Sequence, residues 1–215
     1  WSGSASRCKM SNEAPLLIII SSPSGAGKTT LTTRLRERVP NLRFSISHTT
    51  RAPRNGEQDG REYHFVSRET FLRLLQLDEF LEWAEVHGNY YGTSRKEVES
   101  AKDARGLIFD VDHQGARQIK SVQPEAVSVF ILPPSMDVLE QRLRGRASED
   151  EATVQRRFAV AKQEIAHYGQ FDYLLLNDDL EDATQRLLGI FRAEECRRWR
   201  TARRAENLLT QGRGQ

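Results

Sequence analysis

The segment from Ser22 to Thr29, Ser-Pro-Ser-Gly-Ala-Gly-Lys-Thr, constrains the fold of this 215-residue chain more than any other feature. It follows a short apolar run rich in isoleucine, Leu16 to Ser21, which is typical of a strand buried on both faces of a sheet. Downstream, apolar residues recur every four positions from Leu31 to Val39, which predicts a helix that ends before Pro40. A glycine-rich turn between a buried strand and a helix indicates a phosphate-binding loop.

The residue types of this loop suit the binding of a nucleoside triphosphate. Glycines let backbone N–H groups turn toward one anion, and the start of the following helix adds unpaired N–H donors and a partial positive charge. Lys28 can reach the β- and γ-phosphates, and the Thr29 hydroxyl can bind Mg²⁺. The standard motif begins with glycine, where this chain has Ser22, and the alternative is a turn that only joins strand to helix. The flanking elements favour nucleotide binding, with candidate contacts from Ser22, Pro23, Ser24, Gly25, Ala26, Gly27, Lys28, Thr29 and Thr30.

Charge and cysteine content narrow the class of protein further. The 32 basic and 30 acidic side chains nearly balance, which argues against a dedicated nucleic-acid binder. The longest apolar stretch, Pro15 to Ile20, is too short to cross a membrane, and the only cysteines are Cys8 and Cys196. The histidines lie far apart in the sequence, so a zinc site is not expected. We expect a cytoplasmic globular protein that uses small-molecule substrates and binds neither nucleic acid nor membrane; its oligomeric state stays open.

Short apolar runs alternate with helical patterns along the rest of the chain. Strands are predicted at 44–47, 63–66, 107–111, 127–132 and 173–176, with loops at 51–61 and 89–93. Helices are predicted over 180–199 and after four capping residues: Ser67, Ser94 (with Glu97), Ser135 and Ser148 (with Glu151). This alternation predicts an α/β fold with a parallel sheet covered by helices on both faces.

Five further motifs occur in order along the chain. They are Ser-His-Thr-Thr-Arg-Ala-Pro-Arg-Asn-Gly-Glu at 47–57, Gly-Asn-Tyr-Tyr-Gly-Thr at 88–93, Asp-Val-Asp-His-Gln-Gly at 110–115, Arg-Leu-Arg-Gly-Arg at 142–146 and Asn-Asp-Asp at 177–179. Together with the phosphate loop, they resemble the motifs of bacterial guanylate kinases over residues 16 to about 198. The resemblance implies a P-loop NTPase-type core and transfer of the γ-phosphoryl group of ATP to GMP, and also to dGMP, with Mg²⁺.

The resemblance also implies a division of the chain. Residues 15–46 and 105–205 are expected to form the kinase core, with a mobile lid at about 137–168. The more polar stretch at 47–104 is expected to be an inserted GMP-binding subdomain. Residues 1–14 are interpreted as a disordered leader or a cloning remnant, and residues 206–215 as a flexible tail.

The acceptor site must bind a dianionic phosphate and a guanine base. Arg51 and Arg54 can supply guanidinium forks, which suit bidentate contact with phosphate. Guanine carries donors at N1 and its 2-amino group, so a carboxylate such as Glu82 would accept from both and would be left unpaired by adenine. The resemblance assigns to this site Ser47, Arg51, Arg54, Glu57, Tyr63, Glu82, Tyr91, Thr93, Asp110, Asp112 and Gly115.

Phosphoryl transfer depends mainly on positioning and on cations that stabilise charge in the transition state. With Lys28 of the phosphate loop, the resemblance implies Arg51, Arg142, Arg146 and Arg157 as catalytic cations, although an arginine cluster of this kind can also be a solvated helix face. Asp110 and Asp112 are expected to share one face at the end of a strand. The metal site is predicted at Thr29 and Asp110, the alternative being that the aspartates hold Arg51. By resemblance, Asn177 lies near the adenine of ATP.

Two other functions are compatible with a phosphate loop. One is a P-loop kinase that phosphorylates a sugar phosphate, which would not need Glu82 together with Tyr91 and Thr93. The other is a guanylate-kinase-like interaction module without catalysis, in which the phosphate loop and the lid arginines are typically eroded. Here Lys28 and the arginines are present, which favours the enzyme.

Overall fold

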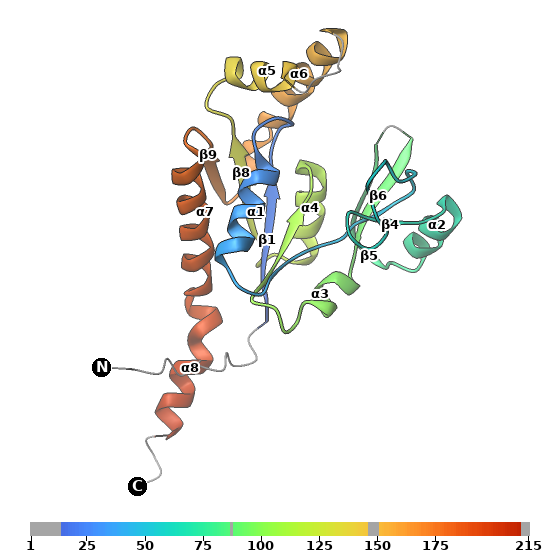
Figure 1. Cartoon of the computed structure of the whole chain (residues 1–215). Helices are drawn as coiled ribbons and strands as arrows, with labels where there is room; N and C mark the ends of the chain where they lie inside the picture. The colour runs from blue at the N-terminus through green and yellow to red at the C-terminus, as the bar shows by residue number, and fades with distance from the viewer. Residues whose placement is uncertain (1–13, 87, 146–150, 212–215) are drawn as a thin grey trace.

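The computed structural model describes residues 14–86, 88–145 and 151–211 (Figure 1). Its centre is a sheet of five parallel strands in the order β2-β7-β1-β8-β9. The strands are β1 (Leu16–Ser21), β2 (Leu42–Phe44), β7 (Gly106–Asp110), β8 (Val127–Leu132) and β9 (Tyr173–Leu176). The predicted α/β class and the parallel sheet are confirmed.

Alternate residues of the central strands pack into two separate cores. Leu16, Ile18 and Ile20 of β1 face α1 (Lys28–Arg38) and α7 (Leu180–Glu195). Leu17 and Ile19 face the other side, where α4 (His113–Val122) packs with Ala116 and Ile119. Helices therefore cover both faces of the sheet (Figure 1), which explains why its central strands are predominantly apolar.

A second sheet, formed by residues between 48 and 94, lies beside the first (Figure 1). Its order is β4-β3-β6-β5, with β3 (His48–Thr49), β4 (His64–Phe65), β5 (Phe80–Val86) and β6 (Asn89–Ser94). The helix α2 (Arg68–Gln76), which is capped by Ser67 as predicted, places Phe71 against Phe80 and Tyr90. The short helix α3 (Lys96–Ser100) leads back to the core.

Two helices lie beyond the carboxyl ends of the core strands (Figure 1). These are α5 (Met136–Arg144), capped by Ser135 as predicted, and α6 (Glu151–Ile165). They pack through a small core of their own, formed by Leu139, Leu143, Val154 and Ala161. The 3₁₀ turn η1 (Tyr168–Gln170) then leads into β9. The predicted cap at Ser148 lies outside the described residues.

Several expectations were wrong in detail. Residues 89–93 form strand β6 rather than a loop, and its partner β5 was not predicted. The strand expected at 44–47 lies at Leu42–Phe44. The capping box of Ser94 and Glu97 does not form, because Glu97 Oε2 accepts from the backbone N–H of Ile46 instead (2.9 Å).

The carboxyl end of the chain also differs from the expectation. The helix predicted over 180–199 is divided into α7 and α8 (Arg198–Gln211), so residues 206–211 are helical rather than part of a flexible tail. No residue of α8 is buried, and its many Arg, Ala, Glu and Leu residues are good helix formers without tertiary packing. Within the described part of the chain, no helix is long and apolar enough to cross a membrane.

Candidate functional site

The phosphate loop leaves the carboxyl end of β1 and enters α1 at Lys28. Gly25 and Gly27 have φ angles of 93° and 97°, a left-handed conformation that other residues rarely adopt. The N–H of Ala26 donates to the carbonyl of Pro23 (3.2 Å), and the Ser22 hydroxyl donates to the same carbonyl (3.1 Å). The loop is thus a compact turn that aims the N-terminus of α1 at any anion bound in front of it.

Asn177, the residue that follows β9, holds this loop through a side-chain hydrogen bond. Its buried side-chain amide donates a hydrogen bond to the Ala26 carbonyl at 2.7 Å. A Cβ atom at Gly27 would lie 2.3 Å from Asn177 Nδ2, so only glycine fits there. The same carbonyl accepts a longer contact from Arg142 Nη1 at 3.5 Å.

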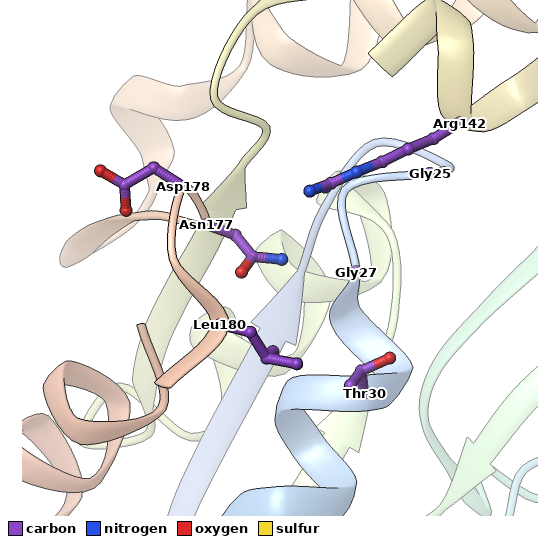
Figure 2. Close-up of a pocket in the computed structure, with 7 residues that line it drawn as sticks. All are labelled: Gly25, Gly27, Thr30, Arg142, Asn177, Asp178 and Leu180. Atoms are coloured by element: carbon purple, nitrogen blue, oxygen red, sulfur yellow. The ribbon is translucent and has the colours of Figure 1, made fainter. Parts of the chain in front are cut away.

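A cavity of about 350 Å³ opens beside the loop. In Figure 2 Arg142 reaches from α5 toward the loop, and the carboxylate of Asp178 points away from it. Thr30 and Leu180 approach from α1 and α7. The cavity is lined by Gly25, Gly27, Thr30, Arg142, Asn177, Asp178 and Leu180.

A second cavity, of about 340 Å³, also borders the loop. It brings the side chains of Lys28 and Thr29 together with the carboxylates of Asp112 and Glu164. Arg157, from α6, donates from Nη2 to the Ser24 hydroxyl at 2.7 Å. The full lining is Ser22, Pro23, Ser24, Gly25, Gly27, Lys28, Thr29, Thr30, Asp112 and Glu164.

The two aspartates of the third motif have different structural roles. Asp110, the last residue of β7, forms an ion pair with Lys28. Asp112 is the N-cap of α4, and its Oδ1 accepts from the N–H groups of Gln114 and Gly115, both at 2.9 Å. The expectation that both carboxylates share a strand face was wrong because β7 ends before Asp112. Neither aspartate is an ion-pair partner of Arg51.

Arg51 pairs with Glu57 instead. Its Nη1 and Nη2 atoms donate to the two carboxylate oxygens at 3.0 and 2.9 Å, and Glu57 also accepts from the Arg54 N–H at 2.7 Å. The guanidinium lies 5.5 Å from the ring of Tyr63. Hydrogen bonds to Glu57 and to Tyr91 raise the pKa of Arg51, so this group is a permanent cation. The side chain of Arg54 is exposed.

Glu82 is a buried carboxylate that accepts a hydrogen bond from one hydroxyl group, which in turn contacts a second. Only 6% of the residue is exposed, and Oε1 accepts from Thr93 Oγ1 at 2.6 Å. The Ser47 hydroxyl lies 3.0 Å from that of Thr93. Burial raises the pKa of Glu82 to about 7, against the opposing effect of the Thr93 hydrogen bond.

Gly115 explains how α4 can approach this carboxylate. A Cβ atom there would lie 3.0 Å from Glu82 Oε2 and 2.9 Å from Val111 Cβ. The first turn of α4 therefore touches both regions, because Asp112 lines the cavity of the phosphate loop and Gly115 packs against Glu82.

The predicted residues thus gather in three neighbouring groups. The loop residues lie with Asn177, Arg142 and Arg157; the Arg51 group includes Glu57, Tyr63 and Tyr91; the Glu82 group includes Ser47, Thr93 and Gly115. Arg146 lies outside the described residues. Sequence reasoning missed Glu164, since nothing in its local pattern separates it from the other charged residues of α6.

A parallel sheet, a phosphate loop after its first strand and cations from several elements around that loop define a P-loop phosphotransferase. The model of the family Guanylate kinase matches residues 15–194, and the chain belongs to this family.

Individual relatives agree with this membership. A guanylate kinase of Aromatoleum aromaticum is 51% identical over 182 residues, which cover 84% of this chain and 89% of that protein. A guanylate kinase of Vibrio cholerae is 47% identical over 197 residues, or 90% of this chain and 95% of that protein. Among solved structures, guanylate kinase from Anaplasma phagocytophilum superposes with a TM-score of 0.71 at 36% identity, covering 87% of this chain and 90% of the other.

Proposed function

We propose that this chain is an ATP:GMP phosphotransferase, which moves the γ-phosphoryl group of ATP to the phosphate of GMP and releases ADP and GDP; dGMP is a plausible second acceptor. The observation that carries this proposal is the first turn of α4, which joins the cavity of the phosphate loop to the buried carboxylate of Glu82. The proposed binding site for the triphosphate of ATP would therefore lie next to the carboxylate that we propose recognises the guanine base.

The ATP site is assigned to the phosphate loop and the two cavities beside it. The N–H groups at the start of α1, together with Lys28, would bind the phosphates. The cavity of about 350 Å³ lined by Asn177 and Arg142 would take the rest of the nucleotide. Arg142, Arg146 and Arg157 would approach the phosphates from the lid, which we assign to about 137–168 and which comprises α5 and α6.

The GMP site is assigned to the insertion at 47–104 and to α4. The ionised Glu82 would accept hydrogen bonds from guanine N1 and the 2-amino group, with Thr93 and Ser47 fixing its orientation. The hydroxyls of Tyr63 and Tyr91 and the forks of Arg51 and Arg54 would bind the GMP phosphate. Glu57 would hold Arg51 in place for that contact.

The catalytic role of the protein would be to bring the two phosphates together and to balance negative charge. Lys28 and Arg51, with the lid arginines, are the cations available for the transferring phosphoryl group. Closure of α5 and α6 over the site would exclude water and so limit hydrolysis of ATP.

Magnesium fits the oxygen-rich donor set of this site. The Thr29 hydroxyl lines one cavity with two carboxylates, and Asp110 adds another at the end of β7. Among the described residues, no group of three or more His, Cys, Asp or Glu side chains could hold a metal. Mg²⁺ is commonly bound by one or two protein ligands together with substrate phosphates. Bound Mg²⁺ would supply positive charge to the phosphoryl oxygens; Thr29 and Asp110 remain its proposed protein contacts.

The direct test is to identify both products. We expect that incubation with Mg-ATP and GMP forms ADP and GDP in equal amounts, and that omission of GMP nearly abolishes ADP release. An interaction module would form neither product. A sugar-phosphate kinase would release ADP with a ribose phosphate but not with GMP. We place the activity in the cytoplasm, with no role for nucleic acid or membrane.

A further inference from the structure

Glu164 is an acidic residue inside a site that must bind a polyanion. It belongs to the last turn of α6 and lines the same cavity as Lys28, Thr29 and Asp112. A carboxylate in this place repels the phosphates of ATP, since charges within a few ångströms interact strongly when partly shielded from water. The predicted roles of the lid do not account for it.

The contacts of Glu164 tie α6 to the phosphate loop. Its carboxylate lies near the backbone N–H of Ser24, and Arg157, two helical turns earlier, donates to the hydroxyl of the same serine at 2.7 Å. The side chains of Arg157 and Glu164 lie on one face of α6, and both contact Ser24 of the loop. The other carboxylate oxygen, Oε2, is buried and has no hydrogen-bond partner among the described residues.

The N–H of Ser24 is a donor of the kind that a phosphate oxygen requires. Backbone N–H groups of such loops normally point toward the bound anion. Lys28 shows the same arrangement, since its ammonium group is paired with Asp110. In this conformation, two groups that would serve a triphosphate are therefore engaged by carboxylates of the protein itself.

We propose that Glu164 is a positioning residue of the lid that competes with the phosphates of ATP for the Ser24 N–H, so that ATP binding displaces its carboxylate and changes the contact between α6 and the loop. Glu164 then weakens ATP binding and couples it to movement of α6. This inference rests on the proposed ATP site and adds a residue to it. Phosphate-loop anions such as pyrophosphate are subject to the same competition.

Glu164→Gln separates this role from a merely structural one. The amide has nearly the same size and keeps an oxygen that can accept from the Ser24 N–H, so only the negative charge is lost. We expect the Kd for ATP, measured calorimetrically without GMP, to fall about tenfold. The Kd for pyrophosphate should fall as well, and the Kd for GMP should stay unchanged. Glu164→Asp keeps the charge, so its Kd for ATP should remain closer to that of the unmodified protein.

The matched control is Glu206→Gln, which removes the same charge from an exposed position on α8. Its Kd for ATP should not change. An unchanged or higher Kd for ATP in Glu164→Gln would overturn the competition, as would an equal gain in Glu206→Gln. Failure of the unmodified protein to form GDP would instead count against the proposed function, because the binding comparison does not depend on turnover.

Discussion

The side-chain amide of Asn177 donates a hydrogen bond of 2.7 Å to the carbonyl oxygen of Ala26 and so ties the end of β9 to the phosphate loop. The amide also lies where a side chain on Gly27 would be, which makes the glycine and the asparagine mutually dependent. The family resemblance places Asn177 near the adenine. Its observed contact is with the loop itself, and a supporting role in ATP binding follows.

Asn177→Ala tests this support. Loss of one buried hydrogen bond of about 1 kcal/mol should raise the KM for ATP about fivefold to tenfold. The KM for GMP should stay nearly unchanged, since the amide does not touch the Glu82 or Arg51 groups. Asp178→Asn is the control, because it changes the next residue, which lines the same cavity but points away from the loop. Equal increases in both KM values would contradict a role confined to the loop.

The burial of Glu82 predicts a stability difference that depends on pH. Its pKa rises from 4.5 to about 7 on folding, so the folded state binds the proton more tightly than the unfolded state. Stability is therefore lost as the pH rises from about 4.5 to about 7. Glu82→Gln should unfold with nearly the same free energy as the unmodified protein at about pH 4, and with on the order of 3 kcal/mol more at about pH 8. Urea denaturation at both pH values measures this difference, and a constant difference would contradict the assignment.

The same carboxylate predicts how GMP use depends on pH. Guanine donors need the ionised acid, so kcat/KM for GMP should fall as the pH drops below about 7. Glu82→Gln should lower kcat/KM for GMP by about 100-fold or more and should remove this pH dependence. A pH profile of kcat/KM measures both effects. If the Glu82→Gln variant still lost kcat/KM for GMP at low pH, another group would be responsible for the pH dependence.

The bidentate contact between Arg51 and Glu57 indicates that the planar fork matters as well as the charge. Arg51→Lys should reduce kcat/KM for GMP about 100-fold, because an ammonium group cannot make two parallel hydrogen bonds. Arg61→Lys is the control, since Arg61 is exposed in the same loop and pairs with its neighbour Glu62. Steady-state kinetics with GMP varied distinguishes the two, and similar losses in both variants would count against the role of Arg51.

The phosphate-loop lysine should be needed for chemistry rather than for folding. Lys28→Ala should lower kcat about 1,000-fold or more, as should Arg146→Ala in the lid. Lys28 and its partner Asp110 both remain in contact with water, with 20% and 27% of their side chains accessible, so loss of the pair should lower the midpoint of thermal unfolding without preventing folding. Single-turnover kinetics and calorimetry measure these two quantities. Near-normal turnover in either variant would refute its assignment.

Local patterns were enough to predict the core of this fold. Leu16–Ser21, Val127–Leu132 and Tyr173–Leu176 are strands with the predicted bounds, because they are predominantly apolar and are followed by proline or polar residues. The phosphate loop could be predicted for the same reason, since its spacing and its flanking elements are local. Ser67 and Ser135 cap their helices as predicted.

Properties that depend on distant contacts could not be predicted. Residues 89–93 contain glycine and asparagine and resemble a loop, but pairing with β3 and β5 makes them a strand. The sequence does not distinguish Glu82 from the other acidic residues, because its burial depends on contacts with Thr93 and α4 that form only in the folded structure. The ion pairs also depend on the tertiary structure. Lys28 pairs with Asp110, which is distant in the sequence, whereas Arg51 pairs with Glu57 in the same loop.

The central claim is that a guanine-reading acceptor site faces an ATP site, and base preference tests it most directly. We would measure kcat/KM with saturating Mg-ATP and each of the four nucleoside monophosphates by following ADP release. The value for GMP should exceed that for AMP by about 10⁴-fold, because adenine leaves the carboxylate of Glu82 unpaired. Turnover of AMP at a rate equal to or greater than that of GMP would contradict the account.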